Sequence, residues 1–430
     1  EDRVVDAFLR HHGIWRASDP HDLVNAAELY LKGWRPQGRK LVAVSNSGAT
    51  CVMAADMAEE FQLPLAVLAD ATRGELNAVL PGFATTTNPI DITGALLTDS
   101  SLFGKILGIV GKDAGADLFF AGIPIAGTGY DVEAFARDAA NFIATTGKPL
   151  ALAVPQDDVA APFLKLRVPV FASDRLALRA LDQLAAHTAL MRRQRKAGAA
   201  APVQIILAEG GKPFLNEADS LALLAANGIP VAPQRLCRSV AEAREALRAL
   251  GGPVAVKACS AEVPHKSEFG LVALNLASAD EVGAAFDAQW RKLAQMKVAR
   301  DGIIVAAMVK GQRELALGAR IDARFGPVVM IGDGGKYVEA LQDFALLIPP
   351  FDTDEVIEAL GRLHIAPVLH GVRGEPPLDL EAVAAIAVRL GEIMQAGQGR
   401  IASIDLNPVM VRAKGEGAVV ADALLELIQV

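Results

Sequence analysis

The stretch LVAVSNSGATCVMAADMAEEF, residues 41–61, decides the fold of the first half of the chain. It combines a buried strand, a short loop of small polar residues and a helix. Further apolar runs alternate with helical stretches and lie at 64–69, 117–126, 149–155 and 168–173. This alternation predicts a doubly wound parallel sheet with helices on both faces.

The loop of this first stretch contains Asn46, Ser47 and Gly48. Free backbone N–H groups and the positive end of the helix dipole make the start of a helix suited to hold a phosphate. The segment NPIDITG (88–94) is of the same kind. Any loop between a strand and a helix of such a sheet looks similar, so neither segment decides a function alone.

The sequence changes character at MRRQRKAGAAAP (191–202), which is basic and then rich in small residues. We place a linker at 191–212 and a second unit at 213–430. That unit mixes paired strands with helices, which predicts an α+β fold. Its expected helices are 216–227, 280–297 and 379–396, and its expected strands are 254–258, 302–309, 314–322, 326–332 and 403–411.

The first chemical signal in the second unit is VAVKACSAEVPHKSEFGLV (254–272). Lys257 closes an apolar strand, where its ammonium group is well placed to meet a phosphate. A solvated strand end is the alternative. His265 follows eight residues later, and by itself it is equally an ordinary surface histidine.

The second signal is RIDARFGPVVMIGDGGKYVEAL (320–341), in which a hairpin leads to Gly334 and Gly335. Glycine lets the backbone approach a ligand closely or take a positive φ. Most such turns are only tight turns, and GDGG lacks the spacing of a dinucleotide fingerprint or a P-loop.

The third signal is IDLNPVMV (404–411), followed by VVADALLEL (419–427). Asp405, Asn407 and Asp422 then lie on or beside adjacent extended segments. Carboxylate and amide oxygens are the ligands that Mg²⁺ prefers. An Asn-Pro turn between edge strands explains the same residues without a metal.

Composition excludes several classes of protein. The chain has 430 residues, 52% of them hydrophobic, and its net charge of -8 argues against a nucleic-acid or anionic-membrane surface. Cys51, Cys237 and Cys259 are far apart, which favours a reducing cytoplasm over a disulfide framework. Two or three domains and a small-molecule partner are expected. The chain enters a helical pattern directly at Glu1, which predicts that residues preceded it.

Together these segments resemble the NDP-forming, or ADP-forming, acyl-CoA synthetases, relatives of succinyl-CoA synthetase. The resemblance covers nearly the whole chain. It rests on SNSGA (45–49), NPIDITG, HKSEFG (265–270), FGPVVMIGDGGKYVE (325–339), HGVRGEPPLD (370–379) and IDLNPV (404–409).

The resemblance implies four segments. Residues 1–35 would end a preceding CoA-ligase domain, because FLRHHGIWRASDPHDL (8–23) resembles that region. A flavodoxin-like domain would occupy 36–190, and an ATP-grasp domain would follow the linker and occupy 213–430. The family also implies a homo-oligomer and an N-terminal CoA-binding region, in cis or as a separate chain.

The implied reaction joins a carboxylic acid to CoA with ATP through an acyl phosphate and a phosphohistidine. Lys257, Gly334 and Gly335 would belong to the nucleotide site, and Asn407 with Asp422 would hold Mg²⁺. Imidazole is nucleophilic near neutral pH, so a histidine can carry a phosphoryl group between distant sites.

The resemblance implies the remaining roles as well. His265 matches a histidine that accepts the phosphoryl group in some members, and Asp405 would orient a phosphohistidine. Asn46, Ser47 and Gly48 would hold the phosphoryl group at the other site.

The sequence departs from the family at HKSEFGL, where Glu268 replaces an aspartate and Leu271 a glycine. Two alternatives to an acid–CoA ligase remain open. One is a nonenzymatic regulatory body that senses an acyl-CoA or a nucleotide. The other is an ATP-grasp ligase without CoA, which would leave the first domain without a role.

Overall fold

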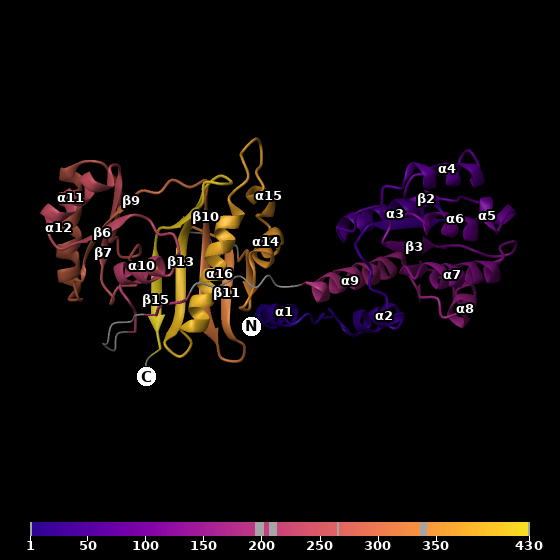
Figure 1. The fold of residues 1–430 in the computed structure, drawn as a ribbon, viewed down its shortest axis with the longest axis horizontal. Helices are drawn as coiled ribbons and strands as arrows, with labels where there is room; N and C mark the ends of the chain where they lie inside the picture. Colours follow the sequence, from indigo (N-terminus) through magenta and orange to yellow (C-terminus); the bar gives the residue numbers. More distant parts are fainter. Residues whose placement is uncertain (1, 194–201, 206–212, 265, 336–341, 429–430) are drawn as a thin grey trace. The chain divides into compact units, whose positions relative to one another are not determined.

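The computed structural model describes residues 2–193, 202–205, 213–264, 266–335 and 342–428 (Figure 1). They form two compact units. We call Gly13–Gln194 the parallel-sheet unit, and Glu1–His12 with Arg195–Val430 the mixed-sheet unit.

The parallel-sheet unit is built on five parallel strands in the order β2-β1-β3-β4-β5. The strands are β1 (Leu41–Ser45), β2 (Ile90–Asp91), β3 (Leu118–Gly122), β4 (Leu150–Ala153) and β5 (Val170–Phe171). Every residue of β1, β3 and β4 is buried, which explains their continuous apolar runs. The order is that of flavodoxin-like folds, as expected, and it reverses direction between β1 and β3.

Helices cover both faces of this sheet. One apolar core joins the sheet to α4, α5, α6, α7 and α8, and the opposite core joins it to α2, α3 and α9. The helices are α2 (Pro20–Tyr30), α3 (Gly48–Glu60), α4 (Asp70–Val79), α5 (Ala95–Thr98), α6 (Leu102–Val110), α7 (Val132–Thr146), α8 (Asp157–Lys165) and α9 (Asp174–Arg192). The carboxyl ends of β1 and β3 therefore open on the edge that the helices leave uncovered.

One apolar run contributes less to the sheet than its sequence indicates. Residues 64–69 form a single parallel bridge, between Leu65 and Leu41. The strand beside β1 is instead β2, from the NPIDITG segment. Asn88 of that segment accepts from Ala43 N at 2.9 Å and donates to Leu41 O at 2.7 Å. This amide side chain therefore occupies the backbone groups of β1 that a longer strand would have paired.

The mixed-sheet unit contains two sheets. The smaller has the order β6-β9-β7-β8, with β6 (Gln234–Cys237), β7 (Val254–Cys259), β8 (Val272–Leu276) and β9 (Gly302–Ala307). Helices α11 (Val240–Leu250) and α12 (Ala279–Met296) share an apolar core with one face. Its other face meets α10 (Glu217–Ala226), which also contacts β15 of the larger sheet. Helix α10 therefore lies between the two sheets (Figure 1).

The larger sheet is antiparallel, with the path β12-β11-β10-β13-β14 and β15 beside β13. Its strands are β10 (Arg313–Asp322), β11 (Gly326–Asp333), β12 (Phe344–Leu347), β13 (Ile401–Val411), β14 (Ala418–Val420) and β15 (Ala423–Leu427). Helices α14 (Thr353–Gly361), α15 (Ala366–Leu369) and α16 (Leu380–Ala396) share the main core with one face. These elements confirm the strands and helices expected after residue 213.

Helix α1 (Asp2–His11) packs on the opposite face of that sheet. Val4 and Ala7 form a small core with Val328 and Ile348, whereas the neighbouring Val329 of β11 faces the main core. Because successive strand residues point to opposite faces, α1 and α16 lie on different sides of β11. In the described part of the chain, no helix is long and apolar enough to cross a membrane.

Asp379 is the last residue of the HGVRGEPPLD motif and fixes the start of α16. Its carboxylate accepts from Ala382 N at 3.1 Å, Gly415 N at 2.9 Å and Gly417 N at 2.8 Å. Burial raises the pKa of this carboxyl, but the three backbone donors more than offset that effect and hold the pKa below its usual value. The aspartate of this motif thus ties α16 to the turn after β13.

We expect Asp379→Ala to lower the free energy of unfolding of the mixed-sheet unit by about 1–2 kcal/mol, because it removes the helix cap and the acceptor of three backbone N–H groups. A depressed pKa stabilises the fold above the unfolded value and loses that contribution as the pH falls through the folded value. The difference from the wild type should therefore shrink below about pH 4. Urea unfolding at several pH values measures it, and an equal difference at neutral and acid pH would contradict this assignment.

Candidate functional site

Three of the predicted side chains line one cavity in the mixed-sheet unit. This cavity of about 210 Å³ is bordered by Pro264, Lys266, Ser267, Glu268, Asp405, Asn407, Asp422, Ala423 and Leu424. We call it the acidic cavity. It lies between the loop that follows β7 and the paired strands β13 and β15.

The strand geometry explains why Asp405, Asn407 and Asp422 meet. Asp405 and Asn407 are two residues apart on β13, so they point to the same face. Asp422 immediately precedes β15, whose Ala423 pairs with Leu406 of β13. Three oxygen-bearing side chains therefore converge on one face of the larger sheet.

The donor set of the cavity fits a hard divalent cation. Carboxylate and amide oxygens suit Mg²⁺, which keeps several waters and fills its other positions with substrate phosphates. In the part of the chain that the structure describes, no three His, Cys, Asp or Glu side chains gather as a closed metal site. The two carboxylates and the amide of Asp405, Asp422 and Asn407 thus fit a Mg²⁺ ion that keeps waters and phosphate oxygens among its ligands.

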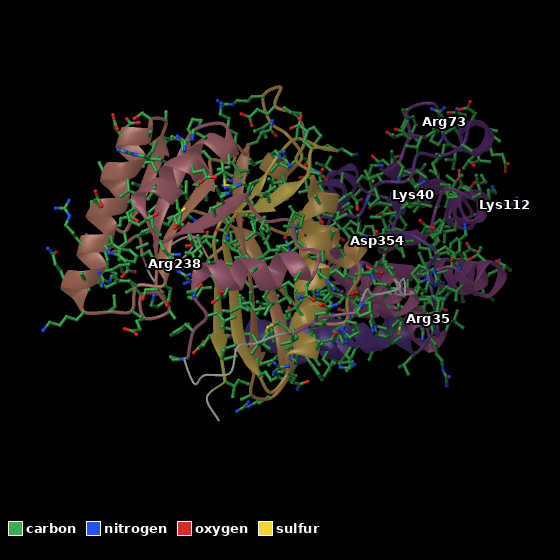
Figure 2. The ribbon with its side chains drawn as sticks, turned by 60° about the vertical axis from the view of Figure 1, so that its left-hand side comes forward. Arg35, Lys40, Arg73, Lys112, Arg238 and Asp354 are labelled. Atoms are coloured by element: carbon green, nitrogen blue, oxygen red, sulfur yellow. The ribbon has the colours of Figure 1, made fainter. Side chains whose placement is uncertain are left out.

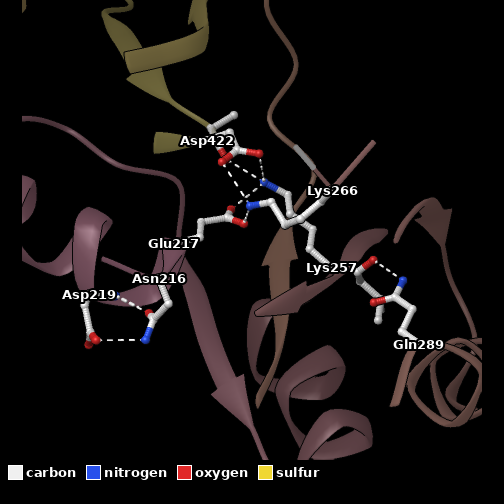
Figure 3. A network of polar contacts seen from close by, with 9 residues as sticks. Asn216, Glu217, Asp219, Lys257, Lys266, Gln289 and Asp422 are labelled. Carbon is white, nitrogen blue, oxygen red and sulfur yellow. Dashed lines mark hydrogen bonds and ion pairs between the residues drawn. The ribbon is translucent and has the colours of Figure 1, made fainter. Parts of the chain in front are cut away.

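Lys257 lies at this site, on β7 of the smaller sheet (Figure 3). Its ammonium donates to Glu217 Oε1 at 2.8 Å, to Ala421 O at 2.8 Å and to Asp422 Oδ2 at 3.5 Å. The side chain is 9% exposed. The predicted strand-end lysine is thus buried beside the acidic cavity, and the solvated strand end is wrong.

A second lysine, Lys266, joins the same network. It pairs with Glu217 Oε2 and lies 3.3 Å from Asp422 Oδ1. Burial lowers the pKa of Lys266, but the carboxylates of Glu217 and Asp422 raise it by a larger amount. The pKa therefore lies above its usual value. Lys266 is therefore a charged group at neutral pH.

Glu217 and Lys266 are the residues that sequence analysis missed. Lys266 stands beside His265 in the motif but was given no role. Glu217 follows Asn216, whose side chain accepts from Asp219 N and caps α10. A buried carboxylate in a first helical turn looks like any acidic residue placed there for the helix dipole, so its sequence signal is weak.

The remaining residues of the mixed-sheet unit lie differently. Gly334 and Gly335 follow the end of β11 and do not line the acidic cavity. A Cβ at Gly334 would lie 2.6 Å from the backbone of Glu314, and Gly335 has a φ of 80°. Close backbone packing therefore explains Gly334 and a positive φ explains Gly335, and their contact with a nucleotide stays a prediction. His265 lies outside the described residues.

Leu271, which replaces the expected glycine, is fully buried in the core of the smaller sheet. Its backbone N–H donates to Lys266 O at 3.0 Å, and its carbonyl accepts from Ala258 N at 3.0 Å. The loop that carries Lys266 is thus anchored to β7 by this leucine. Glu268, the other departure, is exposed but borders the acidic cavity.

The loop predicted to hold a phosphate contains Asn46, Ser47 and Gly48, and we call it the phosphate cradle. It lies at the carboxyl end of β1 in the parallel-sheet unit. Asn46 Nδ2 donates to Ile125 O at 3.0 Å and so links the loops that follow β1 and β3. Its Oδ1 is buried and has no hydrogen-bond partner among the described residues. Ser47 caps α3, and a Cβ at Gly48 would lie 2.9 Å from Asp91 Oδ2.

This cradle coincides with the topological switch point of the sheet. In doubly wound folds, ligands bind outside the carboxyl ends of the strands where the strand order reverses. The start of α3 supplies unpaired N–H groups at that place. The predicted loop is therefore where the fold itself favours an anion.

Figure 2 shows how charged side chains are distributed along both units. Arg35, Lys40, Arg73 and Lys112 belong to the parallel-sheet unit, and Arg238 and Asp354 belong to the mixed-sheet unit. The chain carries 42 Lys and Arg against 50 Asp and Glu. The overall balance therefore supplies no basic excess for a nucleic-acid surface.

Comparison with known proteins gives consistent matches. The ATP-grasp domain family matches residues 206–427. Trans-feruloyl-CoA synthase from an unknown prokaryotic organism is 32% identical over 98% of this chain and 60% of its own length. ADP-forming acetate–CoA ligase I of Archaeoglobus fulgidus is 31% identical over 96% of this chain and 60% of its own length. The chain thus spans about 60% of the length of these two relatives.

The mixed-sheet half also matches shorter proteins. The beta subunit of ADP-forming acetate–CoA ligase II of Pyrococcus furiosus is 32% identical over 52% of this chain and 96% of that subunit. A solved structure of acetyl-coenzyme A synthetase 1 of Ca. Korarchaeum cryptofilum, in complex with coenzyme A and Ca-AMPCP, is 33% identical. It covers 51% of this chain and 95% of that chain, with a TM-score of 0.48.

Proposed function

Because the chain belongs to the family of ADP-forming acyl-CoA ligases with an ATP-grasp domain, we propose that it joins a carboxylic acid to CoA with ATP. The observation that carries the proposal is the acidic cavity. It combines oxygen ligands for Mg²⁺ with buried lysines for phosphate, as a nucleotide site requires.

At this site Asn407 and Asp422 hold Mg²⁺, and Lys257 binds the phosphates of the nucleotide. Bound Mg²⁺ would offset the negative charge of the phosphates and of the phosphoryl group in transfer. Lys257 donates N–H groups to phosphate oxygens in a buried setting, where charge-assisted hydrogen bonds are strong. Gly334 and Gly335 would lie along the nucleotide.

A histidine carries the phosphoryl group between the two units. Its imidazole nitrogen attacks the terminal phosphorus of ATP, the bond to the bridging oxygen breaks, and ADP leaves. Asp405 orients that imidazole by accepting its other N–H, and His265 is the candidate acceptor within this chain.

The parallel-sheet unit serves the second half of the reaction. Asn46, Ser47 and Gly48 would hold the phosphoryl group at the start of α3. A carboxylate oxygen of the acid attacks the phosphorus, the bond between phosphorus and the imidazole nitrogen breaks, and the acyl phosphate forms. The thiol of CoA, losing its proton, then attacks the carbonyl carbon and phosphate leaves. The backbone N–H groups at the start of α3 are the donors that support a phosphoryl group there, whereas the buried acceptor Asn46 Oδ1 requires a hydrogen-bond donor from another group.

CoA itself requires a region beyond the parts described above. We propose that a CoA-binding region acts with this chain, in cis or as a separate chain, and that the assembly is a homo-oligomer working in the cytoplasm. The length of the relatives supports this division, since the chain spans about 60% of them. Their names include different acids, so the acid used here stays open.

An assay of thioester and ADP formation tests the proposal, with ATP, CoA and acids such as acetate and ferulate. We expect the 430 residues alone to form no thioester, because the reaction stops when any one of its sequential steps is missing. Turnover should appear once the CoA-binding region is supplied. Thioester formation by the chain alone would contradict this division of labour. Nucleotide binding without any turnover in the complete assembly would favour the regulatory alternative.

A further inference from the structure

The carboxylate of Glu217 lies between two lysines (Figure 3). Its Oε1 accepts from Lys257 at 2.8 Å, and its Oε2 accepts from Lys266. Glu217 stands in the first turn of α10, where the helix dipole stabilises a negative charge. One buried carboxylate thus holds two ammonium groups side by side, one on each oxygen.

Asp422 faces the same two lysines but holds them less closely. Its oxygens lie 3.5 Å from Lys257 Nζ and 3.3 Å from Lys266 Nζ. Its side chain is 29% exposed, whereas that of Glu217 is 2% exposed. Asp422 is therefore the exchangeable counter-ion of the network, and Glu217 is the permanent one.

The ammonium group of Lys266 has one N–H donor more than it has acceptors among the described residues. An ammonium group has three N–H donors. Within the described residues, Lys266 has two acceptors, Glu217 and Asp422. Its side chain borders the acidic cavity together with Asp405 and Asn407. A third N–H is thus available to a ligand that enters the cavity.

The charges of the network change when a metal enters. Two lysines and two carboxylates sum to zero in the structure as it stands. If Asp422 turns to Mg²⁺, Glu217 remains as the counter-ion of both lysines and the three groups carry one net positive charge. That charge faces the place where phosphate oxygens accompany the metal.

We propose that Glu217 is a positioning residue that holds Lys257 and Lys266 as a pair, and that Lys266 is a second phosphate-binding lysine. The proposal rests on the proposed function, since it assigns the phosphates of a nucleotide to the acidic cavity. A purely structural Glu217 would instead only neutralise two buried lysines. The two roles differ in what happens when the charges are removed together.

Four variants separate the two roles, and titration calorimetry with ADP and Mg²⁺ together with thermal unfolding provides the readouts. Lys266→Met keeps the pair of Glu217 with Lys257 and should weaken binding at least about tenfold, while Lys266→Arg restores part of it. Glu217→Gln should lower both the unfolding midpoint and the affinity, since it leaves two buried cations poorly paired. Asp219→Asn is the matched control, because this exposed residue lies in the same helical turn and contacts Asn216 instead.

The double variant Glu217→Gln/Lys266→Met decides between the roles. It removes one charge of each sign, so the unfolding midpoint should recover while the affinity for Mg-ADP stays low. Wild-type affinity in this double variant or in Lys266→Met would overturn the proposal and leave Glu217 a structural counter-ion. A wild-type chain that binds no Mg-ADP would overturn the proposed function and this inference with it.

Discussion

The Asp422→Ala variant is expected to bind ADP on the order of a hundredfold more weakly than the wild type when Mg²⁺ is present. The variant loses a carboxylate that we assign to the metal. This loss outweighs the opposite effect, which is the added positive charge when Lys257 and Lys266 lose Asp422 as a counter-ion. Titration calorimetry with and without Mg²⁺ measures the affinity.

The dependence on Mg²⁺ is the more specific readout. The wild type should gain affinity when Mg²⁺ is added, and Asp422→Ala should gain far less. Asp280→Ala is the control, because its side chain is 97% exposed at the start of α12. An Asp422→Ala variant that keeps the full Mg²⁺ effect would remove Asp422 from the metal site.

The second large effect is expected at His265. In the assembly supplied with its CoA-binding region, His265→Ala should lower kcat for thioester formation at least about a hundredfold, since a lost covalent step acts on the rate. The affinity for Mg-ADP should change little. The assay of thioester and ADP formation gives the rate, and calorimetry gives the affinity.

His364→Ala is the matched control for this variant. Its side chain is 97% exposed in the same unit and contacts Asp343. It should keep the wild-type rate. A His265→Ala variant with near-normal turnover would make His265 an ordinary loop residue, and the phosphoryl carrier would then have to lie elsewhere.

The residues that we assign to a nucleotide site could be predicted from the sequence where they lie close together on one element. Asp405 and Asn407 alternate along one strand, and Lys257 ends an apolar run, so periodicity alone places them. The sequence also placed Asp422 on or beside an adjacent extended segment, but the resemblance to a family was needed to join these residues with Lys257 in one site. The structure brings these strands together through the pairing of β13 and β15.

Glu217 could not be predicted in the same way. It is 40 residues before Lys257 and 49 before Lys266, and no local pattern connects them. They meet because α10 packs between the smaller sheet and β15. The packing of α1 against β11 and β12 has a similar cause, since the apolar face of α1 was visible but its partner was not.

In the parallel-sheet unit, the sequence predicted the kind of sheet but not every strand in it. Its parallel sheet follows from continuous apolar runs, yet the run at 64–69 forms one bridge and β2 comes from NPIDITG. Apolar content decided burial there, and the side-chain hydrogen bonds of Asn88 decided which segment pairs with β1. Hydrogen bonds between a side chain and a distant backbone carry no periodic signal in the sequence.

The central claim is that the acidic cavity binds a nucleotide together with Mg²⁺. The most direct measurement is a calorimetric titration of the folded 430-residue chain with ADP, first with Mg²⁺ and then with a chelator. We expect saturable one-site binding with Mg²⁺ and much weaker binding after chelation. A folded chain that gives no saturable binding with Mg²⁺, or the same affinity in both titrations, would contradict the claim.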